Sequence, residues 1–300
     1  MRLALLGDIH AYRLIVPPWR LLGKRFLGQV NLWLNRRRQF DLRLLPPVLR
    51  RIGSLAPDLL LLSGDLSTTA IESEFSDVAA MLHALDPVPD TLIVPGNHDR
   101  YTFASRRCRT MERMFAPMVP DRFPHVRRLD KRWYLIALDA AVPRIGSSRG
   151  RIGSAQLGAF AQFLAGLKSE DGVVVLCHYP FGTPPRAGMP WGHRLADAAR
   201  LRALLCSTRS RILYLHGHVH RPWCWQPDDP DLSHLVAVNA GSPTLREEGR
   251  SLGQGFWQIE LPEDPHGPVR LFQHEPDQDL PRSGDWRVLE TLGNEAWTGR

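Results

Sequence analysis

Cysteine is scarce in this sequence, and long apolar runs are absent. The four cysteines, Cys108, Cys177, Cys206 and Cys224, include no Cys-x-x-Cys pair. This spacing argues against the disulfide framework of a small secreted protein. No uncharged stretch approaches the length of a membrane span, and the apolar run in Met1–Asp8 is too short for a signal peptide. We therefore expect a reduced, cytoplasmic protein.

Acidic residues are also in short supply. The chain has 31 Asp and Glu against 38 Lys and Arg, which gives a formal net charge of +7 and a pI near 9.7. This balance favours anionic partners such as phosphate esters, nucleic acid or acidic lipid headgroups. A solvated basic surface is the simpler explanation, so charge alone selects no function. The apolar fraction of 43% over 300 residues is sufficient for one large α/β domain.

Short continuous apolar runs alternate with amphipathic stretches along most of the chain. Continuous runs are typical of strands covered on both faces, and the alternation predicts α/β layers. The predicted strands are Leu3–Leu6, Leu59–Leu62, Leu92–Val94, Leu135–Leu138, Val173–Leu176 and Ile212–Leu215. Amphipathic stretches predict the helices. One begins at Pro46 or Pro47, and the others cover Glu72–Leu85, Ser154–Leu167 with Ser154 as the N-cap, and Leu195–Cys206.

The last third of the chain has a different pattern. Leu235–Asn239, Phe256–Leu261 and Val269–Gln273 are short apolar segments with turn residues and no helices between them. They predict a second sheet, built partly as a meander and packed on the first. The chain then becomes polar, so we divide it into a domain at 1–274 and a tail at 275–300. Trp286, Leu289, Leu292 and Trp297 could dock this tail on the domain.

Five polar islands stand at or near the predicted strand ends. They are Asp8-Ile9-His10, Gly64-Asp65, Gly96-Asn97-His98-Asp99, His178 and Gly217-His218-Val219-His220. Residues two apart point the same way from an extended chain, so Asp8 with His10, and His218 with His220, can each reach one ion. A carboxylate such as Asp65 can bridge two cations. Mixed nitrogen and oxygen ligands suit manganese, iron or zinc, so we predict two divalent metal ions.

In their order along the chain, these islands resemble the calcineurin-like metallophosphoesterase superfamily. The matching positions run from residue 8 to residue 220, and the Asn239–Ser242 turn also resembles a family segment. The resemblance implies an α/β fold, a four-layer α-β-β-α sandwich of two mixed sheets. It also implies one ion held by Asp8, His10, Asp65 and His220, and another held by Asp65, Asn97, His178 and His218.

The resemblance implies a reaction as well. A pair of cations about 3.5–4 Å apart can share a water and lower its pKa, so that a metal-bridging hydroxide attacks phosphorus in line with the leaving oxygen. His98 is the predicted general acid, with Asp99 as the hydrogen-bond partner that keeps its imidazole cationic. Arg100 and Arg221 directly follow ligand motifs and either contact phosphate or form ordinary surface charge. His216 is predicted to be neither ligand nor acid.

Two segments carry the information about substrate. Within an insert at about 17–43, the apolar residues Trp19, Leu22, Phe26, Val30 and Trp33 recur at helical spacing among arginines. This stripe either contacts a membrane surface or an acyl chain, or packs on the domain. The loop Phe181–Arg194 follows His178 and offers Arg186, Trp191, His193 and Arg194 as substrate contacts, or is an ordinary surface loop.

We weigh three hypotheses for a phosphate-ester substrate. A cyclic nucleotide phosphodiester suits the full ligand set and the chain length. A nucleotide-activated lipid such as UDP-diacylglucosamine, cleaved by a pyrophosphohydrolase at the inner membrane face, explains the basic amphipathic insert. A nuclease would use the positive charge, but no regular interleaving of aromatic and basic residues favours nucleic acid. A metal-dependent scaffold is the alternative outside enzymes. No pattern specifies an oligomeric state.

Overall fold

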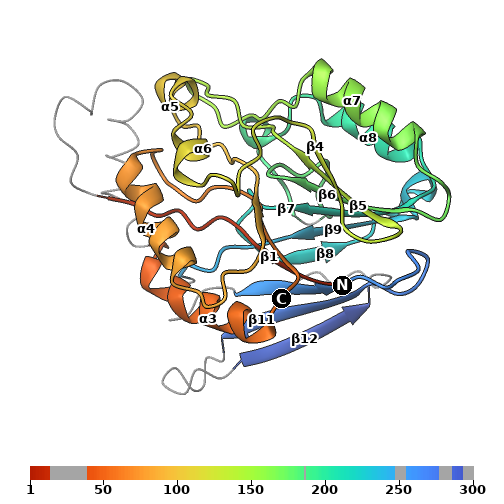
Figure 1. The fold of residues 1–300 in the computed structure, drawn as a ribbon. Helices are drawn as coiled ribbons and strands as arrows, with labels where there is room; N and C mark the ends of the chain where they lie inside the picture. Colours follow the sequence, from red (N-terminus) through yellow and green to blue (C-terminus); the bar gives the residue numbers. More distant parts are fainter. Residues whose placement is uncertain (14–38, 186, 247–254, 277–285, 293–300) are drawn as a thin grey trace.

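The computed structural model describes residues 1–13, 39–185, 187–246, 255–276 and 286–292 (Figure 1). Two six-stranded sheets form its centre. The first has the order β12-β11-β10-β1-β2-β3, in which β1, β2 and β3 are parallel and β10, β11 and β12 are antiparallel additions. Its strands are β1 (Arg2–Leu6), β2 (Leu59–Leu62), β3 (Thr91–Ile93), β10 (Phe256–Glu260), β11 (Arg270–Pro276) and β12 (Trp286–Leu292).

The second sheet has the order β4-β5-β6-β7-β9-β8. Its four central strands are parallel, and the edge strands β4 and β8 are antiparallel to their neighbours. The strands are β4 (His125–Arg128), β5 (Trp133–Leu138), β6 (Gly172–Cys177), β7 (Arg211–His216), β8 (Trp223–Trp225) and β9 (Leu235–Asn239).

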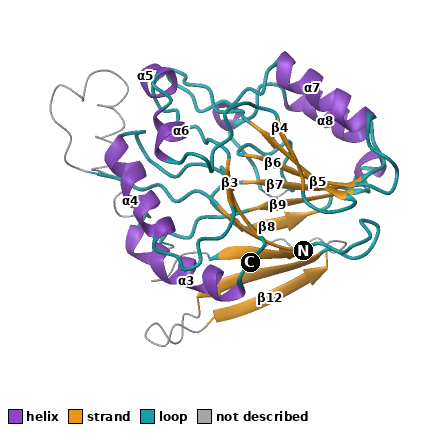
Figure 2. Cartoon of the chain, in the orientation of Figure 1, coloured by secondary structure: helices purple, strands orange, loops and turns teal. Residues whose placement is uncertain are grey.

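Helices cover the outer faces of both sheets (Figure 2). The first sheet is covered by α3 (Leu45–Leu55) and α4 (Glu72–His83), with α5 (Phe103–Arg107) and α6 (Thr110–Met114) beyond them. The second is covered by α7 (Ser154–Ala165) and α8 (Ala198–Cys206). The described residues also form the short 3-10 helices η3 (Leu42–Leu44), η4 (Trp191–His193) and η5 (Pro230–Leu232).

The strand residues alternate between two cores. In β1, Leu3 and Leu5 face the layer between the sheets, whereas Ala4 and Leu6 face α3 and α4. Both faces are therefore buried, which explains why the strands are continuously apolar in sequence. The predicted α-β-β-α sandwich of two mixed sheets is confirmed.

The predicted membership of the second sheet was wrong. β9 lies parallel to β7 in the second sheet, but β10 and β11 pair back onto β1 in the first. An apolar run shows that a strand is buried, but it does not show which sheet edge the strand joins. The open edge of β1 accepts β10, so the late strands are shared between the sheets.

Two local expectations also differ from the structure. Ser154 is the first residue of α7, and Gly153 occupies the N-cap position with φ +87°. Within the predicted tail at 275–300, Trp286–Leu292 forms β12 and pairs with β11 at the sheet edge. Trp286 also contacts the ring of Phe256, with centroids 5.9 Å apart, so this part of the chain docks as the sequence allowed.

The amphipathic stripe of the insert lies outside the described residues, as do Arg186 and Trp297. None of the helices in the described part of the chain has the length and hydropathy of a membrane span.

Candidate metal centre

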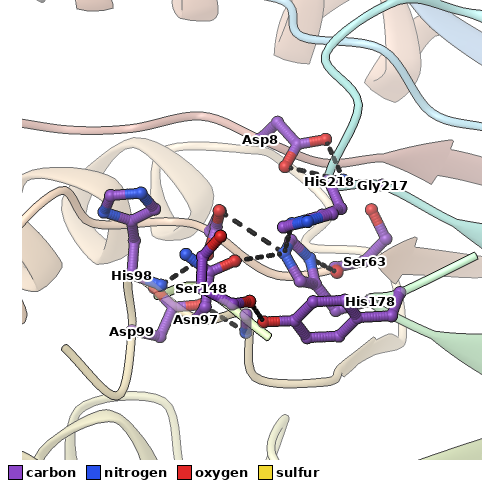
Figure 3. A network of polar contacts seen from close by, with 12 residues as sticks. Asp8, Ser63, Asn97, His98, Asp99, Ser148, His178, Gly217 and His218 are labelled. Carbon is purple, nitrogen blue, oxygen red and sulfur yellow. Dashed lines mark hydrogen bonds and ion pairs between the residues drawn. The ribbon is translucent and has the colours of Figure 1, made fainter. Parts of the chain in front are cut away.

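The predicted ligands come together from both sheets. Asp8, Asp65 and Asn97 follow β1, β2 and β3, while His178 and His218 follow β6 and β7. The carboxyl ends of these parallel strands meet at one edge of the sandwich, where loops gather functional side chains. Figure 3 shows Asp8, Asn97, His178 and His218 drawn close together there.

One group of donors comprises Asp8, His10, Asp65 and His220, whose ligand atoms all lie within 4.8 Å of one another. Nε2 of His10 is 2.9 Å from Nε2 of His220 and 3.7 Å from Oδ2 of Asp65. Nε2 of His220 is 3.9 Å from Oδ1 of Asp8. This group coincides with the first predicted ligand set.

A second group comprises Asp65, His178 and His218 within the same limit of 4.8 Å. Nε2 of His178 lies 3.4 Å from Oδ2 of Asp65, 3.2 Å from Nδ1 of His218 and 3.2 Å from Oδ1 of Asn97. Asn97 thus joins the group as predicted. Asp65 belongs to both groups, the position that a bridging carboxylate needs.

The backbone at the ligands is unusual. Five predicted ligands have positive φ: Asp8 (50°), His10 (51°), Asp65 (53°), His218 (75°) and His220 (60°). Residues other than glycine rarely adopt this conformation, and when they do they often lie at functional sites. The departure from extended geometry means that side chains two apart converge through turns rather than through simple strand alternation.

Backbone carbonyls orient two of the imidazoles. Nδ1 of His178 lies 2.8 Å from the carbonyl oxygen of Ser63, and Nε2 of His218 lies 2.8 Å from that of His193. A carbonyl accepts only from a protonated nitrogen. Each ring therefore turns its other nitrogen toward the second group, the arrangement that metal-binding histidines have.

Burial and neighbouring charges shift the pKa values of the residues at this site. Burial raises the pKa of Asp8 well above its usual range. Burial opposes ionisation of Asp65 too, but the imidazoles of His178 and His98 hold its pKa well below normal. Burial alone would lower the pKa of His178, whereas Asp65 and Asp8 raise it to about 9. Two buried carboxylates among imidazoles are a donor set that suits divalent transition metals.

Comparison with known proteins agrees with this geometry. The model of the family described as calcineurin-like phosphoesterase matches residues 1–222. The chain belongs to the calcineurin-like phosphoesterase family. A search of curated proteins finds no match.

Solved structures share the fold of this calcineurin-like phosphoesterase. A dimetal phosphatase from Danio rerio has a TM-score of 0.63 at 15% identity, with 97% of this chain and 98% of that chain covered. The purple acid phosphatase PPD1 from yellow lupin (Lupinus luteus) seeds has a TM-score of 0.61 at 13% identity, with 96% and 53% covered. PhoD has a TM-score of 0.59 at 10% identity, with 96% and 68% covered.

The predicted acid His98 lies beside the first group of donors. Its ring makes an edge contact with His10 at 4.9 Å and stacks on Tyr101 at 5.6 Å between centroids. Its Nδ1 is 2.7 Å from the carbonyl oxygen of Thr68, and its backbone nitrogen donates to Oδ1 of Asp65 at 2.8 Å. The imidazole is therefore held in place by the Thr68 carbonyl and by the rings of His10 and Tyr101.

Asp99 does not pair with the His98 imidazole, contrary to the prediction. Its carboxylate accepts hydrogen bonds from the backbone nitrogens of Gly96 (2.9 Å) and Ser67 (3.0 Å) and from the Ser67 hydroxyl (3.2 Å). Burial and the neighbouring carboxylate of Asp65 raise the pKa of Asp99 to about 7. The side chain of Asp99 points back into the loops and joins the loop of Gly96 to the loop of Ser67. The partner of the His98 imidazole is the Thr68 carbonyl instead.

The arginines differ in what holds them. Arg100 is buried, and its Nη2 lies 2.8 Å from Oε1 of Glu112 and 3.0 Å from Oδ2 of Asp139. These carboxylates pair with the guanidinium, which the sequence allowed either to contact phosphate or to form ordinary surface charge. Arg221 is exposed directly after His220, where both earlier interpretations stay open.

Two histidines outside the ligand groups have different positions. His193 is brought to the site, because its backbone oxygen holds His218, while its Nδ1 lies 2.7 Å from Oγ of Ser148. His216, the last residue of β7, is fully buried and packs against Trp223. Burial lowers its pKa to about 3. It lies with the core under α7 and α8, and neither group of donors includes it.

Sequence reasoning missed two aromatic residues at the site. Phe40 is 3% exposed, and its ring lies 4.5 Å from His10 and 5.5 Å from His220. Tyr179 is buried with its ring 4.4 Å from His218. Tyr179 adjoins His178 in sequence, which was a usable signal. Nothing in the sequence around Phe40 distinguished it from the rest of the insert.

Proposed function

We propose that this protein is a dinuclear-metal-dependent phosphodiesterase that hydrolyses a phosphodiester of the cyclic nucleotide type. The observation that carries the proposal is the sharing of Asp65 between two groups of nitrogen and oxygen donors. Two cations held side by side, when bound, neutralise phosphoryl oxygens and make a water acidic enough to act as a nucleophile. Manganese, iron and zinc all suit the ligand set.

The protein's own residues position the groups that react. Oδ1 of Asp65 accepts a hydrogen bond from the backbone nitrogen of His98, and Oδ2 lies 3.4 Å from Nε2 of His178 and 3.7 Å from Nε2 of His10. The carboxylate is thus fixed between the two groups. We assign Asp8, His10 and His220 to one cation, and Asn97, His178 and His218 to the other.

His98 is assigned as the general acid. Its Nδ1 is engaged by the Thr68 carbonyl, so Nε2 is the nitrogen that can deliver a proton to the leaving oxygen. The alkoxide released from an alkyl diester is a poor leaving group and needs such a proton. Asp99 acts as a positioning residue, because it ties the loop of Gly96 to that of Ser67.

A pyrophosphohydrolase of a nucleotide-activated lipid is the second candidate. The basic amphipathic stripe of the insert favours it, because such a stripe suits a membrane surface. The protein would then act in the cytoplasm at the inner membrane face. Liposome sedimentation of the triple variant Trp19→Ser, Phe26→Ser, Trp33→Ser tests this: reduced binding supports the membrane role, and unchanged binding contradicts it.

One set of assays separates the candidates. Manganese-loaded protein is incubated with bis-p-nitrophenyl phosphate, cyclic AMP and a UDP-linked acylated sugar. The proposal predicts turnover of bis-p-nitrophenyl phosphate and of cyclic AMP. Turnover of only the UDP-linked sugar selects the pyrophosphohydrolase, and two bound metals without hydrolysis of any ester select a metal-dependent scaffold.

A further inference from the structure

An exposed tryptophan stands beside the metal centre with an arginine on its ring. Cζ of Arg149 lies 4.0 Å from the centroid of the Trp191 ring, and Trp191 is 66% exposed. With the guanidinium over one face, an indole of this exposure can offer its other face to a ligand. An open aromatic face next to a cation is well suited to stack on a planar, negatively charged ligand.

The pair is held in place by hydrogen bonds between two loops. The backbone nitrogen of Ser148 donates to the carbonyl oxygen of Gly192 at 3.0 Å, and its hydroxyl lies 2.7 Å from Nδ1 of His193. Ser148 and Gly192 are the sequence neighbours of Arg149 and Trp191. These bonds therefore fix the distance between the two stacking residues.

The same loops are joined to the metal centre. The backbone oxygen of His193 lies 2.8 Å from Nε2 of the predicted ligand His218. The buried ring of Tyr179 packs against His218, and its hydroxyl donates to the carbonyl oxygen of Ser148. The Arg149–Trp191 pair is thus positioned, through Ser148 and His193, on the side of the second donor group.

Arginine outnumbers the acidic residues on these loops. Residues 139–153 and 178–197 include Arg144, Arg149, Arg151 and Arg194, against Asp139 and Asp197, whose carboxylates accept hydrogen bonds from the backbone nitrogens of Ala141, Ile152 and Gly153. A surface of this kind next to a phosphoesterase site favours a substrate that carries negative charge in addition to its scissile group.

We propose that Trp191 and Arg149 form a stacking site for the nucleobase of the substrate, with the arginine supplying positive charge for an adjoining phosphate. This inference rests on the proposed function and specifies its substrate as a nucleotide. The shared chemistry is a base with its phosphate, found in both cyclic nucleotides and UDP-linked lipids. Trp191 is then a specificity-determining residue, outside the metal ligands.

The test is calorimetric binding of 5′-AMP, 5′-UMP and ribose 5-phosphate to metal-loaded protein. Wild type is expected to bind at least one of the nucleotides roughly 10-fold more tightly than ribose 5-phosphate. Trp191→Ala removes this preference and leaves the affinity for ribose 5-phosphate unchanged, whereas Trp191→Phe keeps most of it. Phe103→Ala, which removes an aromatic residue 64% exposed on α5, is the matched control and behaves as wild type.

The outcomes separate this inference from the proposed function. Equal affinity of wild type for all three ligands overturns the stacking site, even if bis-p-nitrophenyl phosphate is hydrolysed. A nucleotide preference that survives Trp191→Ala also overturns it. A preference lost in Trp191→Ala, in a protein that hydrolyses no ester, supports the site and contradicts the phosphodiesterase. Preference for AMP favours the cyclic nucleotide, and preference for UMP favours the UDP-linked lipid.

Discussion

The backbone nitrogen of His98 donates a 2.8 Å hydrogen bond to Oδ1 of Asp65, the carboxylate common to both donor groups. The proposed acid and the proposed bridging ligand are thus joined through the main chain. A change of the His98 side chain leaves this bond in place. The role of the imidazole can therefore be separated from the integrity of the metal centre.

Replacing the imidazole should affect turnover and spare the metals. We expect His98→Ala to retain wild-type metal content and to lose about 10²–10⁴-fold in kcat on an alkyl phosphodiester. The loss should be smaller on a p-nitrophenyl ester, whose leaving group needs little protonation. Metal analysis and steady-state kinetics on both esters check this. Full activity of the variant on the alkyl ester would show that His98 is not the acid.

Gly96 has no room for a side chain. A Cβ at this position would lie 2.1 Å from Oδ1 of Asp65 and 2.4 Å from its backbone nitrogen. Gly96→Ala should therefore destabilise the fold by roughly 1–3 kcal/mol and weaken metal binding, because the displaced atoms belong to the bridging residue. Denaturant unfolding and metal titration measure both effects.

Gly158 provides the matched control for Gly96. It lies within α7, and a Cβ there would have no heavy atom within 4 Å. Gly158→Ala should stabilise the protein by up to ~1 kcal/mol, because alanine is the better helix former. Equal effects of the two substitutions would refute the steric account of Gly96.

Arg100 should contribute to stability rather than to substrate binding. Its guanidinium is buried between Glu112 and Asp139, so Arg100→Met leaves two carboxylates, each with a side chain only 12% exposed, without their cation. We expect a loss of roughly 3–5 kcal/mol in the free energy of unfolding. The exposed residue Arg221 gives the comparison: Arg221→Met should leave stability within ~0.5 kcal/mol of wild type. A raised KM in Arg100→Met at unchanged stability would restore the phosphate-binding role.

Glu74 should make stability depend on pH. This buried residue of α4 accepts hydrogen bonds from the backbone nitrogen and hydroxyl of Thr69, and burial raises its pKa from 4.5 to about 7. Between these values the native state holds a proton that the unfolded state has released. Stability therefore falls as pH rises from 4.5 through 7 and levels off above.

The variant Glu74→Gln isolates this effect. It cannot ionise, so between pH 4.5 and pH 8 wild type should lose roughly 3 kcal/mol more stability than the variant. Denaturant unfolding of both proteins across this range measures the difference. Parallel pH profiles would mean that Glu74 titrates normally in the folded protein.

The strands and the ligand positions were largely predictable from sequence. Runs such as Leu59–Leu62 are apolar on both faces because both faces are buried, and polar residues directly after them stand out. Asp65 and His178 could thus be placed at strand ends that must meet. The covering helices followed from their amphipathic spacing.

Pairing and side-chain partners were less predictable. The return of β10 to β1 depends on an open sheet edge that local sequence does not encode. Asp99 was expected to pair with the His98 imidazole because the two residues are adjacent in sequence. Adjacent side chains diverge, however, and the Asp99 carboxylate accepts hydrogen bonds from the backbone nitrogens of Gly96 and Ser67 instead. Arg100 likewise looked exposed, because Glu112 and Asp139 are distant in sequence.

The most direct test of the central claim is the metal content of Asp65→Ala beside that of His10→Ala. Asp65 lies in both donor groups, whereas His10 lies in only one. After loading with manganese and removal of free metal, mass spectrometry of the native protein should show two ions per chain in wild type, one in His10→Ala and none in Asp65→Ala. Two ions retained in Asp65→Ala would contradict a centre built on a shared carboxylate.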